Sequence, residues 1–371
     1  MSKIDKTGIS RFEKITIFLL LVCLAVIIGI MATVIISINN SDIKQYIRAD
    51  TEMITEDTSE NRSGNTLVYD TYNGEYSVFV KDVFAAKFMS FDEAVEYAKS
   101  HENASVKRSG GSSWLWDNTP QFNVYRSGSD EYKAFIEFGD AANYAWENGD
   151  AEVFYRKNSS FIWNTYSDIP EEKMISDIEP IGQYPELYRG CEVTSLAMLL
   201  RYRGYDVSKM QLAREIKKEP MISYDDDGRQ YYGNPNNGFV GNIYDENEEG
   251  LGVYHQPMYE LLAKYDEKNA VDLSGSRFED LFYFLNRNIP VAVIVSSEYR
   301  VLPEENFEYW DTREGTIRVT FDEHCVLVCG YDRNKIYCND PMKDGRIVGY
   351  DRDNFIRSWI QMGRQAVSVC K

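Results

Sequence analysis

An unbroken apolar run of 24 residues, Ile15–Ile38, divides this chain and limits what each side of it can fold into. In a helix that rises about 1.5 Å per residue, a run of this length spans the roughly 30 Å hydrocarbon core of a membrane. A cleaved signal peptide has a shorter apolar core and a small-residue cleavage site, and neither is evident here. The sequence therefore predicts an uncleaved single-pass anchor at residues 15–38.

The charges on the two sides of the run predict its orientation. Residues 1–14 contain four Lys or Arg residues against two acidic ones, and acidic residues such as Asp50 and Glu52 follow the run. The positive-inside rule places the more basic flank in the cytoplasm. We therefore expect a cytoplasmic tail at residues 1–14 and residues 39–371 outside the cell membrane, at a bacterial surface. Residues 39–65 are polar and acidic, which is typical of a stalk or linker.

Length, charge and cysteine content exclude some classes of protein. The 371 residues are enough for one large domain or two modest ones with full cores. The net charge of −19 argues against a nucleic-acid partner, because no basic face could dominate. The six cysteines are too few and too clustered for a disulfide framework, and Cys23 lies in the apolar run. We expect no nucleic-acid binding and no essential disulfide.

Residues 66–164 repeat themselves with a constant offset of 47 residues. The matching pairs include Phe88 with Phe135, Ala94 with Ala141, Tyr97 with Tyr144, and Trp116 with Trp163. Each unit is predicted to contain a strand, an acidic amphipathic helix (Ser90–Ser100 or Glu137–Asn148) and two short strands that end in Trp. The aromatic residues are explained as the cores of two small α+β modules. The alternative is a ligand-binding face formed by Trp114, Trp116, Trp163 and neighbouring tyrosines.

Residues 165–371 form the second predicted domain, and its most informative segment is Gly182–Leu200, GQYPELYRGCEVTSLAMLL. After Cys191 the apolar residues recur at helical spacing, so a helix is expected to begin there. The unpaired N–H groups and the dipole at a helix N-terminus favour an anion, which would lower the pKa of the thiol and make it nucleophilic. The alternative is a buried core cysteine.

The segments after this helix predict a mixed α and β domain around the cysteine. Helices are expected at Lys209–Lys218, Met258–Tyr265 and Phe278–Asn286, and the apolar run Pro290–Ser296 is expected to be a central strand. Residues 225–257 are a long polar stretch whose glycines and aromatics favour an ordered loop that lines a cleft. The acidic clusters lack EF-hand spacing, and no cluster has zinc spacing. We therefore expect no metal and no cofactor.

A candidate base occurs in a predicted antiparallel hairpin. The β-rich runs His324–Cys329 and Lys335–Asn339 are joined by a turn, so the start of the first strand lies beside the end of the second. This arrangement brings His324 to Asp340. A carboxylate fixes the tautomer of a histidine and stabilises its imidazolium, as in a catalytic triad. His324 is the one histidine of three with a carboxylate brought to it by local structure, and His255 is the competing candidate.

Four segments of this domain resemble the cysteine peptidases related to those that remove double-glycine leaders from bacteriocins, particularly their stand-alone C-thirty-nine-like branch. The segments are PELYRGCEVTSLAMLL, GNPNNGFVGNI, GLGVYHQP and HCVLVCGYD…CNDP, and the resemblance covers residues 165–371. It implies a papain-like α+β domain in which Cys191 is the nucleophile, His324 the general base and Asp340 its orienting partner. Gln183 would supply the oxyanion-hole donor, although it lies further from the cysteine than is usual in papain-type enzymes. No phosphate-binding G-x-x-x-x-G-K-[ST] loop is present, so a leader-processing transporter is excluded.

The sequence as a whole predicts a membrane-anchored extracellular thiol hydrolase, with an anchor, two small α+β repeats and a papain-like domain. Its substrate would be a peptide or a cell-wall peptide. We expect four residues beside the nucleophile or in the Gly-Asn-Pro segment to bind substrate: Gly190, Glu192, Asn234 and Phe239. Two alternatives stay open. One is a cell-wall peptide amidase or transpeptidase with the same three groups, and the other is a surface binding protein whose peptidase fold is catalytically idle.

Overall fold

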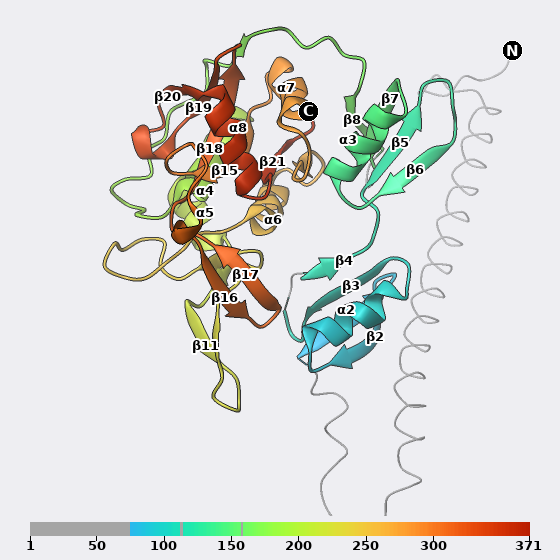
Figure 1. Cartoon of the computed structure of the whole chain (residues 1–371), viewed down its shortest axis with the longest axis vertical. Coiled ribbons are helices and arrows are strands. Elements are labelled where there is room, and N and C mark those ends of the chain that lie inside the picture. The colour runs from blue at the N-terminus through green and yellow to red at the C-terminus, as the bar shows by residue number, and fades with distance from the viewer. Residues whose placement is uncertain (1–74, 112–113, 157–158) are drawn as a thin grey trace, which may run out of the picture. The chain divides into compact units, whose positions relative to one another are not determined.

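The computed structural model describes residues 75–111, 114–156 and 159–371 (Figure 1). The predicted tail, anchor and stalk, residues 1–65, lie outside these residues. Within the described ranges, no helix has both the length and the apolar character needed to cross a membrane. The anchor and its orientation therefore stay predictions.

The first module is a four-stranded antiparallel sheet with one helix packed on it. Its strands follow the order β2-β1-β3-β4. The elements are β1 (Tyr76–Val80), β2 (Val83–Phe88), α2 (Phe91–Lys99), β3 (Ala104–Arg108) and β4 (Trp116–Asp117). Ala94, Val95 and Ala98 recur at helical spacing, and α2 therefore buries them together against the sheet.

The second module has the same order of elements and of strands, β6-β5-β7-β8. The elements are β5 (Phe122–Arg126), β6 (Tyr132–Phe135), α3 (Phe138–Glu147), β7 (Ala151–Tyr155) and β8 (Ser160–Asn164). Helices α2 and α3 each lie within one residue of the predicted helical bounds. Trp163 is 2% exposed and packs edge-on against Phe138, which makes it a core residue and removes it from a ligand-binding face. The boundaries 66–164 of a tandem repeat stay a prediction.

The C-terminal domain is built on a seven-stranded antiparallel sheet (Figure 1). Six strands follow the order β14-β21-β15-β18-β19-β20, and β9 pairs with β18. Their bounds are β9 (Lys173–Met174), β14 (Ala270–Asp272), β15 (Val291–Ser296), β18 (Glu323–Tyr331), β19 (Lys335–Asn339), β20 (Ile347–Asp351) and β21 (Ala366–Val369). Strand β15 is buried throughout and lies between β21 and β18, which confirms the central strand predicted at Pro290–Ser296.

Helices pack against this sheet, and one of them begins at Cys191. They are α4 (Cys191–Tyr202), α5 (Lys209–Glu215), α6 (His255–Tyr265), α7 (Phe278–Asn286) and α8 (Arg352–Gln361). Helix α4 packs against β18 and β15, and α8 packs against β15, β19 and β20. Helix α7 has the predicted bounds. Helix α6 begins three residues earlier than predicted, because Pro257 falls in its first turn, where proline is tolerated.

The polar stretch 225–257, predicted to be an ordered loop, contains two short strands, and a hairpin that the sequence did not predict follows β15. These strands are β12 (Gln230–Tyr232) and β13 (Phe239–Val240), which pair with two strands that precede the stretch, β11 (Ile222–Tyr224) and β10 (Lys218–Glu219). The hairpin consists of β16 (Glu308–Thr312) and β17 (Gly315–Val319). Two 3₁₀ turns complete the domain, η2 (Glu304–Asn306) and η3 (Pro341–Lys343).

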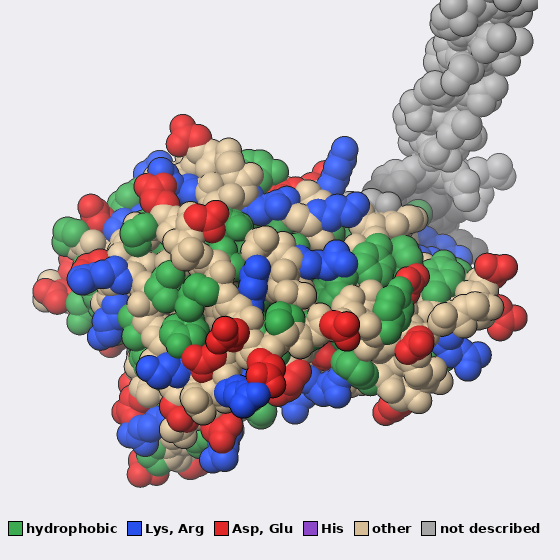
Figure 2. Space-filling view, turned by 90° about the horizontal axis from the view of Figure 1, so that it is seen from above, with side chains coloured by type: hydrophobic (Ala, Val, Ile, Leu, Met, Phe, Trp, Pro, Cys, Tyr) green, Lys and Arg blue, Asp and Glu red, His purple; other side chains and the backbone are tan. Residues whose placement is uncertain are grey.

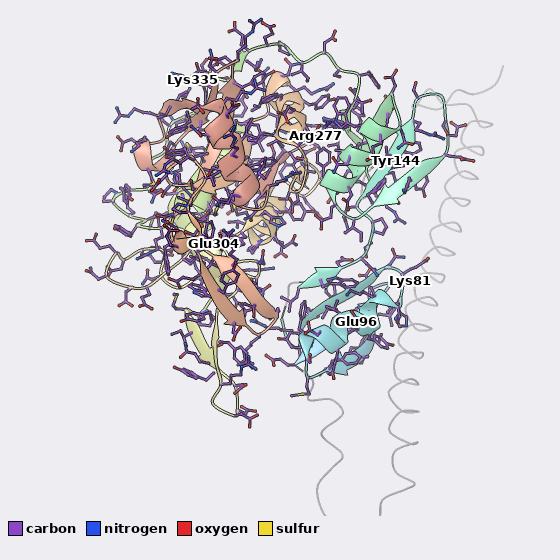
Figure 3. All side chains as sticks on the ribbon, viewed as in Figure 1. Lys81, Glu96, Tyr144, Arg277, Glu304 and Lys335 are labelled. Carbon is purple, nitrogen blue, oxygen red and sulfur yellow. The ribbon has the colours of Figure 1, made fainter. Side chains whose placement is uncertain are left out.

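The second module contacts the C-terminal domain through α7. The indole N–H of Trp146 donates to Asp280 Oδ1 (2.8 Å), and the guanidinium of Arg277 lies 4.4 Å from the centre of the Trp146 ring. Arg277 is labelled in Figure 3, as is Tyr144 of the module. On the face drawn in Figure 2, basic and acidic side chains are interspersed with apolar ones, so neither sign of charge covers that face.

Candidate active site

Cys191 is the first residue of α4, as the sequence predicts. Gly190 precedes it as the N-cap, and a Cβ at this position would lie 2.5 Å from Leu187 Cβ, so only glycine fits. Every residue from Cys191 to Leu200 is buried. The candidate nucleophile is therefore fixed by a buried helix whose first N–H groups have no partner within the helix. Packing against Leu187 explains why residue 190 is glycine, whereas contact between Gly190 and substrate stays a prediction.

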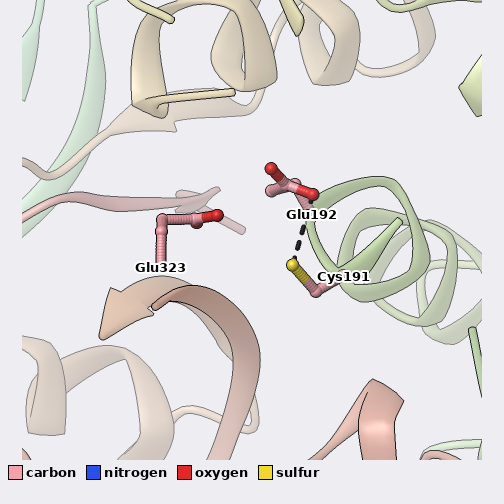
Figure 4. A group of neighbouring side chains, drawn as sticks. All are labelled: Cys191, Glu192 and Glu323. Atoms are coloured by element: carbon pink, nitrogen blue, oxygen red, sulfur yellow. Dashed lines mark hydrogen bonds between the residues drawn. The ribbon is translucent and has the colours of Figure 1, made fainter. Parts of the chain in front are cut away.

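The thiol of Cys191 lies beside two carboxyl groups. The residue is 6% exposed, and its Sγ donates a hydrogen bond to Glu192 Oε2 (3.3 Å). The sulfur and one carboxylate oxygen each from Glu192 and Glu323 lie within 4.8 Å of one another (Figure 4). Burial raises the pKa of the thiol well above its usual value, and the charges of Glu192 and Glu323 raise it further. The expectation of a lowered thiol pKa is therefore wrong for this structure, because the fold adds carboxylates that the helix end alone did not reveal.

His324 and Asp340 form the contact that the hairpin predicts. Their atoms Nε2 and Oδ1 are 2.9 Å apart, and the side chains are 1% and 0% exposed. The register explains the contact: Leu327 on β18 pairs with Asn339, the last residue of β19, so Asp340 continues toward the beginning of β18. The pair is therefore shielded from water, and the carboxylate selects the orientation of the imidazole ring.

Two tyrosines hold the other oxygen of Asp340. The hydroxyl of Tyr299 donates to Oδ2 (2.5 Å), and the hydroxyl of Tyr350 donates to the same atom. The N–H of Met342 donates to Oδ1 (2.9 Å). Burial alone would raise the pKa of Asp340, but the hydrogen bonds from His324, Tyr299 and Tyr350 outweigh burial and hold the pKa below its usual value. Asp340 is therefore kept ionised and immobile by four donors.

His324 lies on the strand segment that packs beside Cys191. Its neighbour in the chain, Glu323, brings a carboxylate to the thiol. Ser195, one turn along α4, donates to Cys325 O (3.2 Å) and fastens the helix to the strand. Among the described residues, the hydrogen bonds include none between Cys191 and His324, because the thiol is directed to Glu192. Such bonds often form only in the substrate complex.

Gln183 is tied to the loop that carries Asp340. Its N–H donates to Pro341 O (3.0 Å), and its side-chain Nε2 donates to Tyr188 O (2.9 Å). This second bond uses one of the two amide hydrogens, so the other can serve a further acceptor. Next to it, Tyr184 is 44% exposed, and its pKa is raised by burial and then by the charges of Tyr188, Cys191 and Asp340. Gln183 therefore lies in the segment that borders the thiol.

The other residues predicted to bind substrate have structural partners. Phe239 is completely buried in β13 under the ammonium of Lys218, so it is a core residue in this structure. Asn234 is 5% exposed and donates to Glu314 Oε2 (3.3 Å), while its Oδ1 accepts from the N–H of Asn236 (3.0 Å). We therefore retain neither Phe239 nor Asn234 as a substrate contact.

His255 has a carboxylate partner of its own, which local sequence did not reveal. Its Nδ1 lies 2.5 Å from Asp272 Oδ2, and β14 brings this aspartate to the start of α6. Burial alone would lower the pKa of His255, but Asp272 outweighs it and raises the pKa. A cavity of about 320 Å³ is lined in part by His255, Tyr254 and Arg318. The prediction that His324 is the one histidine with a carboxylate brought to it by local structure did not cover tertiary contacts, which give His255 a carboxylate partner as well.

Three residues of the site were missed by sequence reasoning: Glu323, Tyr299 and Tyr350. Glu323 had a signal, because it directly precedes His324, just as Glu192 directly follows Cys191. The tyrosines had no such signal, because nothing in the sequence distinguishes them among the 27 Tyr of the chain. Tyr299 precedes Asp340 by 41 residues, and Tyr350 follows it by 10.

Comparisons with known proteins agree on the C-terminal domain. The model of the family described as Peptidase_C39 like matches residues 175–367. YvpB of Bacillus subtilis (strain 168), described as uncharacterized, is 42% identical over 192 residues, which cover 50% of this chain and 71% of YvpB. A crystal structure of a Bacillus anthracis protein, described as a candidate C39-like peptidase, shares 46% identity with a TM-score of 0.52. This match covers 54% of the present chain and 98% of the other.

Proposed function

Because the chain belongs to the Peptidase_C39 like family, we propose that it is a cysteine peptidase in which Cys191 attacks a peptide or amide carbonyl. The observation that carries the proposal is the buried contact between His324 Nε2 and Asp340 Oδ1, on the strand that packs against the helix of Cys191. A histidine held by an ionised carboxylate can accept a thiol proton and then deliver it to a leaving amine.

The proposed reaction has two stages. Cys191 transfers its thiol proton to His324, and its sulfur bonds to the carbonyl carbon of the substrate. His324 then returns the proton to the amine as the C–N bond breaks, which leaves a thioester on Cys191. In the second stage His324 takes a proton from water, the resulting hydroxide attacks the thioester, and the carboxylic acid product leaves as the thiol re-forms. The thiol must first turn away from Glu192, its partner in the free protein.

The negative charge on the carbonyl oxygen requires hydrogen-bond donors. The N–H of Cys191 is one of the unpaired groups at the start of α4, and the second amide hydrogen of Gln183 Nε2 is the proposed second donor. The bond from Gln183 N–H to Pro341 O supports this role, since it ties Gln183 to the loop that carries Asp340.

We further propose that residues 15–38 anchor the protein in the cell membrane, with the peptidase domain outside the cell. The length of the apolar run and the charges that flank it support this proposal. Protease digestion of intact cells tests the orientation, because an external domain is digested without lysis and an internal one is protected.

The catalytic proposal is tested by profiling purified full-length protein on libraries of peptides and cell-wall peptide fragments, with new termini read by mass spectrometry. Wild type should generate new termini, and Cys191→Ala and His324→Ala should generate none. Cys370→Ala is the matched control, because it makes the same change at a cysteine outside the site and should leave cleavage intact.

Equal cleavage by wild type and Cys191→Ala would remove Cys191 as the nucleophile. The absence of any cleavage by folded wild type across both libraries would favour the idle binding protein instead. Folding of each variant is checked by thermal unfolding, so that a lost activity is not confused with a lost structure.

A further inference from the structure

Glu192 and Glu323 present two carboxyl groups to the sulfur of the proposed nucleophile (Figure 4). Glu192 is fixed at both oxygens: Oε1 accepts from the N–H of Val253 (2.7 Å), and Oε2 accepts from the Cys191 thiol (3.3 Å). In Figure 4, Glu323 extends from the opposite side toward Glu192 and the sulfur. The two acids come from different elements, α4 and β18, so tertiary packing alone makes them neighbours.

The two carboxyl groups both pack closely against the main chain at Gly252. A Cβ built on this glycine would lie 2.6 Å from Glu323 Oε2 and 2.7 Å from Glu192 Oε1. Both distances are below ordinary contact, so any side chain at residue 252 would displace the acids. The pair is therefore a close-packed arrangement with defined positions.

The pair lacks a cation in the part of the chain that the structure describes. There, no Lys, Arg or His nitrogen forms an ion pair with either carboxylate. Lys218 is near enough to stabilise the charge of Glu192, but its ammonium lies over the ring of Phe239 (4.8 Å). Glu192 is 0% exposed, and Glu323 Oε1 is buried without a hydrogen-bond partner among the described residues. The carboxylate of Glu323 that lies beside the reactive sulfur thus has one buried oxygen without a partner among the described residues.

Burying two neighbouring carboxyl groups costs free energy unless a positive charge lies beside them. Burial raises the pKa of Glu192 to about 7, and burial together with the charge of Glu192 raises the pKa of Glu323 well above its usual value. A cation in contact with both groups would replace the water that they have lost and favour their ionised forms.

We propose that Glu192 and Glu323 form a subsite for a cationic group of the substrate, an ammonium or a guanidinium, beside the bond that Cys191 attacks. The inference rests on the proposed function, since it takes Cys191 as the nucleophile. The carboxylate oxygens lie within 4.8 Å of the sulfur, and one extended residue spans about 3.5 Å. The cation therefore belongs to a residue next to the scissile bond. The substrate class is a peptide with a basic or diamino residue, or a free amine, at that position.

The experiment compares charged and neutral thiol reagents on purified full-length protein, in the presence of a metal chelator. The reagents are 2-aminoethyl, methyl and 2-sulfonatoethyl methanethiosulfonate, which carry positive, zero and negative charge. In each case the Cys191 thiolate displaces methanesulfinate and forms a mixed disulfide. Rates are read by mass spectrometry of the peptide that contains Cys191 and are divided by the rates with 2-mercaptoethanol. This division corrects for the intrinsic reactivity of each reagent. The ratio between two reagents then no longer depends on the fraction of Cys191 that is ionised.

Wild type should react at least about tenfold faster with the cationic reagent than with the neutral one, and about tenfold slower with the anionic one. Glu323→Gln should bring both ratios to within about threefold of unity. Glu305→Gln is the matched control, because it removes the same charge from an exposed residue of the same domain and should leave both ratios unchanged. Wild-type ratios near unity, or equal effects of the two variants, would overturn the inference.

Failure of the subsite and failure of the proposed function give different results. Cleavage that depends on Cys191 but is equal next to lysine and next to norleucine, with labelling ratios near unity, refutes the subsite and keeps the peptidase. Strong preference for the cationic reagent without cleavage of any peptide supports the subsite and refutes the peptidase. Glu323→Gln is preferred to a variant of Glu192, because Glu192 is completely buried and its change endangers folding.

Discussion

Replacing Asp340 with asparagine should preserve the active site far better than replacing it with alanine. Asp340 accepts hydrogen bonds from His324, Met342, Tyr299 and Tyr350. In Asp340→Asn the side-chain oxygen can keep the bonds from His324 and Met342. The new NH₂ group then faces the two tyrosine hydroxyls, which can rotate and accept its hydrogens, because a hydroxyl is both donor and acceptor.

The expected magnitudes follow from the number of donors left without an acceptor. Asp340→Ala leaves the four donors that face this carboxylate without an acceptor, and a buried donor left unpaired typically costs about 1–3 kcal/mol. We therefore expect Asp340→Ala to lose about 4 kcal/mol of unfolding free energy. Asp340→Asn keeps the bonds and loses only the charge, for which about 1–2 kcal/mol is expected, or roughly tenfold in the peptidase rate.

Denaturant unfolding at pH 7 and cleavage of a library-derived peptide provide the two measurements. The pKa of Asp340 is lower in the folded protein than in the unfolded chain, so the stability it adds is present above about pH 4 and is lost as the pH falls below that value. Asparagine does not titrate, and the gap between wild type and Asp340→Asn should therefore narrow below about pH 4. The reasoning fails if Asp340→Asn is as unstable as Asp340→Ala, or if the gap is independent of pH.

Three further predictions concern the surrounding groups. The pKa of Glu192 rises from 4.5 to about 7 on folding, so the charge of Glu192 destabilises the folded protein as the pH rises from 4.5 to 7. Between pH 5 and pH 8 the unfolding free energy of Glu192→Gln, measured with denaturant, should therefore increase by on the order of 2 kcal/mol relative to that of wild type. A difference between the two proteins that does not change with pH would contradict this. Gly252→Ala should lower the preference of Cys191 for the cationic thiol reagent over the neutral one at least about threefold and lower the melting temperature, because its Cβ would displace Glu192 and Glu323. Unchanged values of both would refute the contact. His255→Ala should lower the unfolding free energy by about 2 kcal/mol, because Asp272 loses its partner, yet peptide cleavage should persist. A loss of cleavage as large as that of Cys191→Ala would refute the assignment of His324 as the base.

Much of the fold was predictable because it depends on local patterns. The apolar run of β15, the helical spacing after Cys191 and the bounds of α7 are each contained in a dozen residues or fewer. Strand β14 was not predicted, because three residues, Ala270–Asp272, give too short a pattern and pair with β21 near the other end of the domain. The hairpin of β16 and β17 was missed for a related reason, since alternating exposure is weak in a short, partly exposed ribbon.

The sequence by itself determined which side chains could do chemistry, because a helix start and a hairpin are short-range structures. They place Cys191 at the N-terminus of α4 and bring Asp340 to His324. Only the tertiary structure decided the charge around the thiol, since burial and the distance between Cys191 and Glu323 depend on how α4 packs against β18. Electrostatic interactions act through space and strengthen where water is excluded. The direction of the thiol pKa therefore could not be derived from its neighbours in the chain.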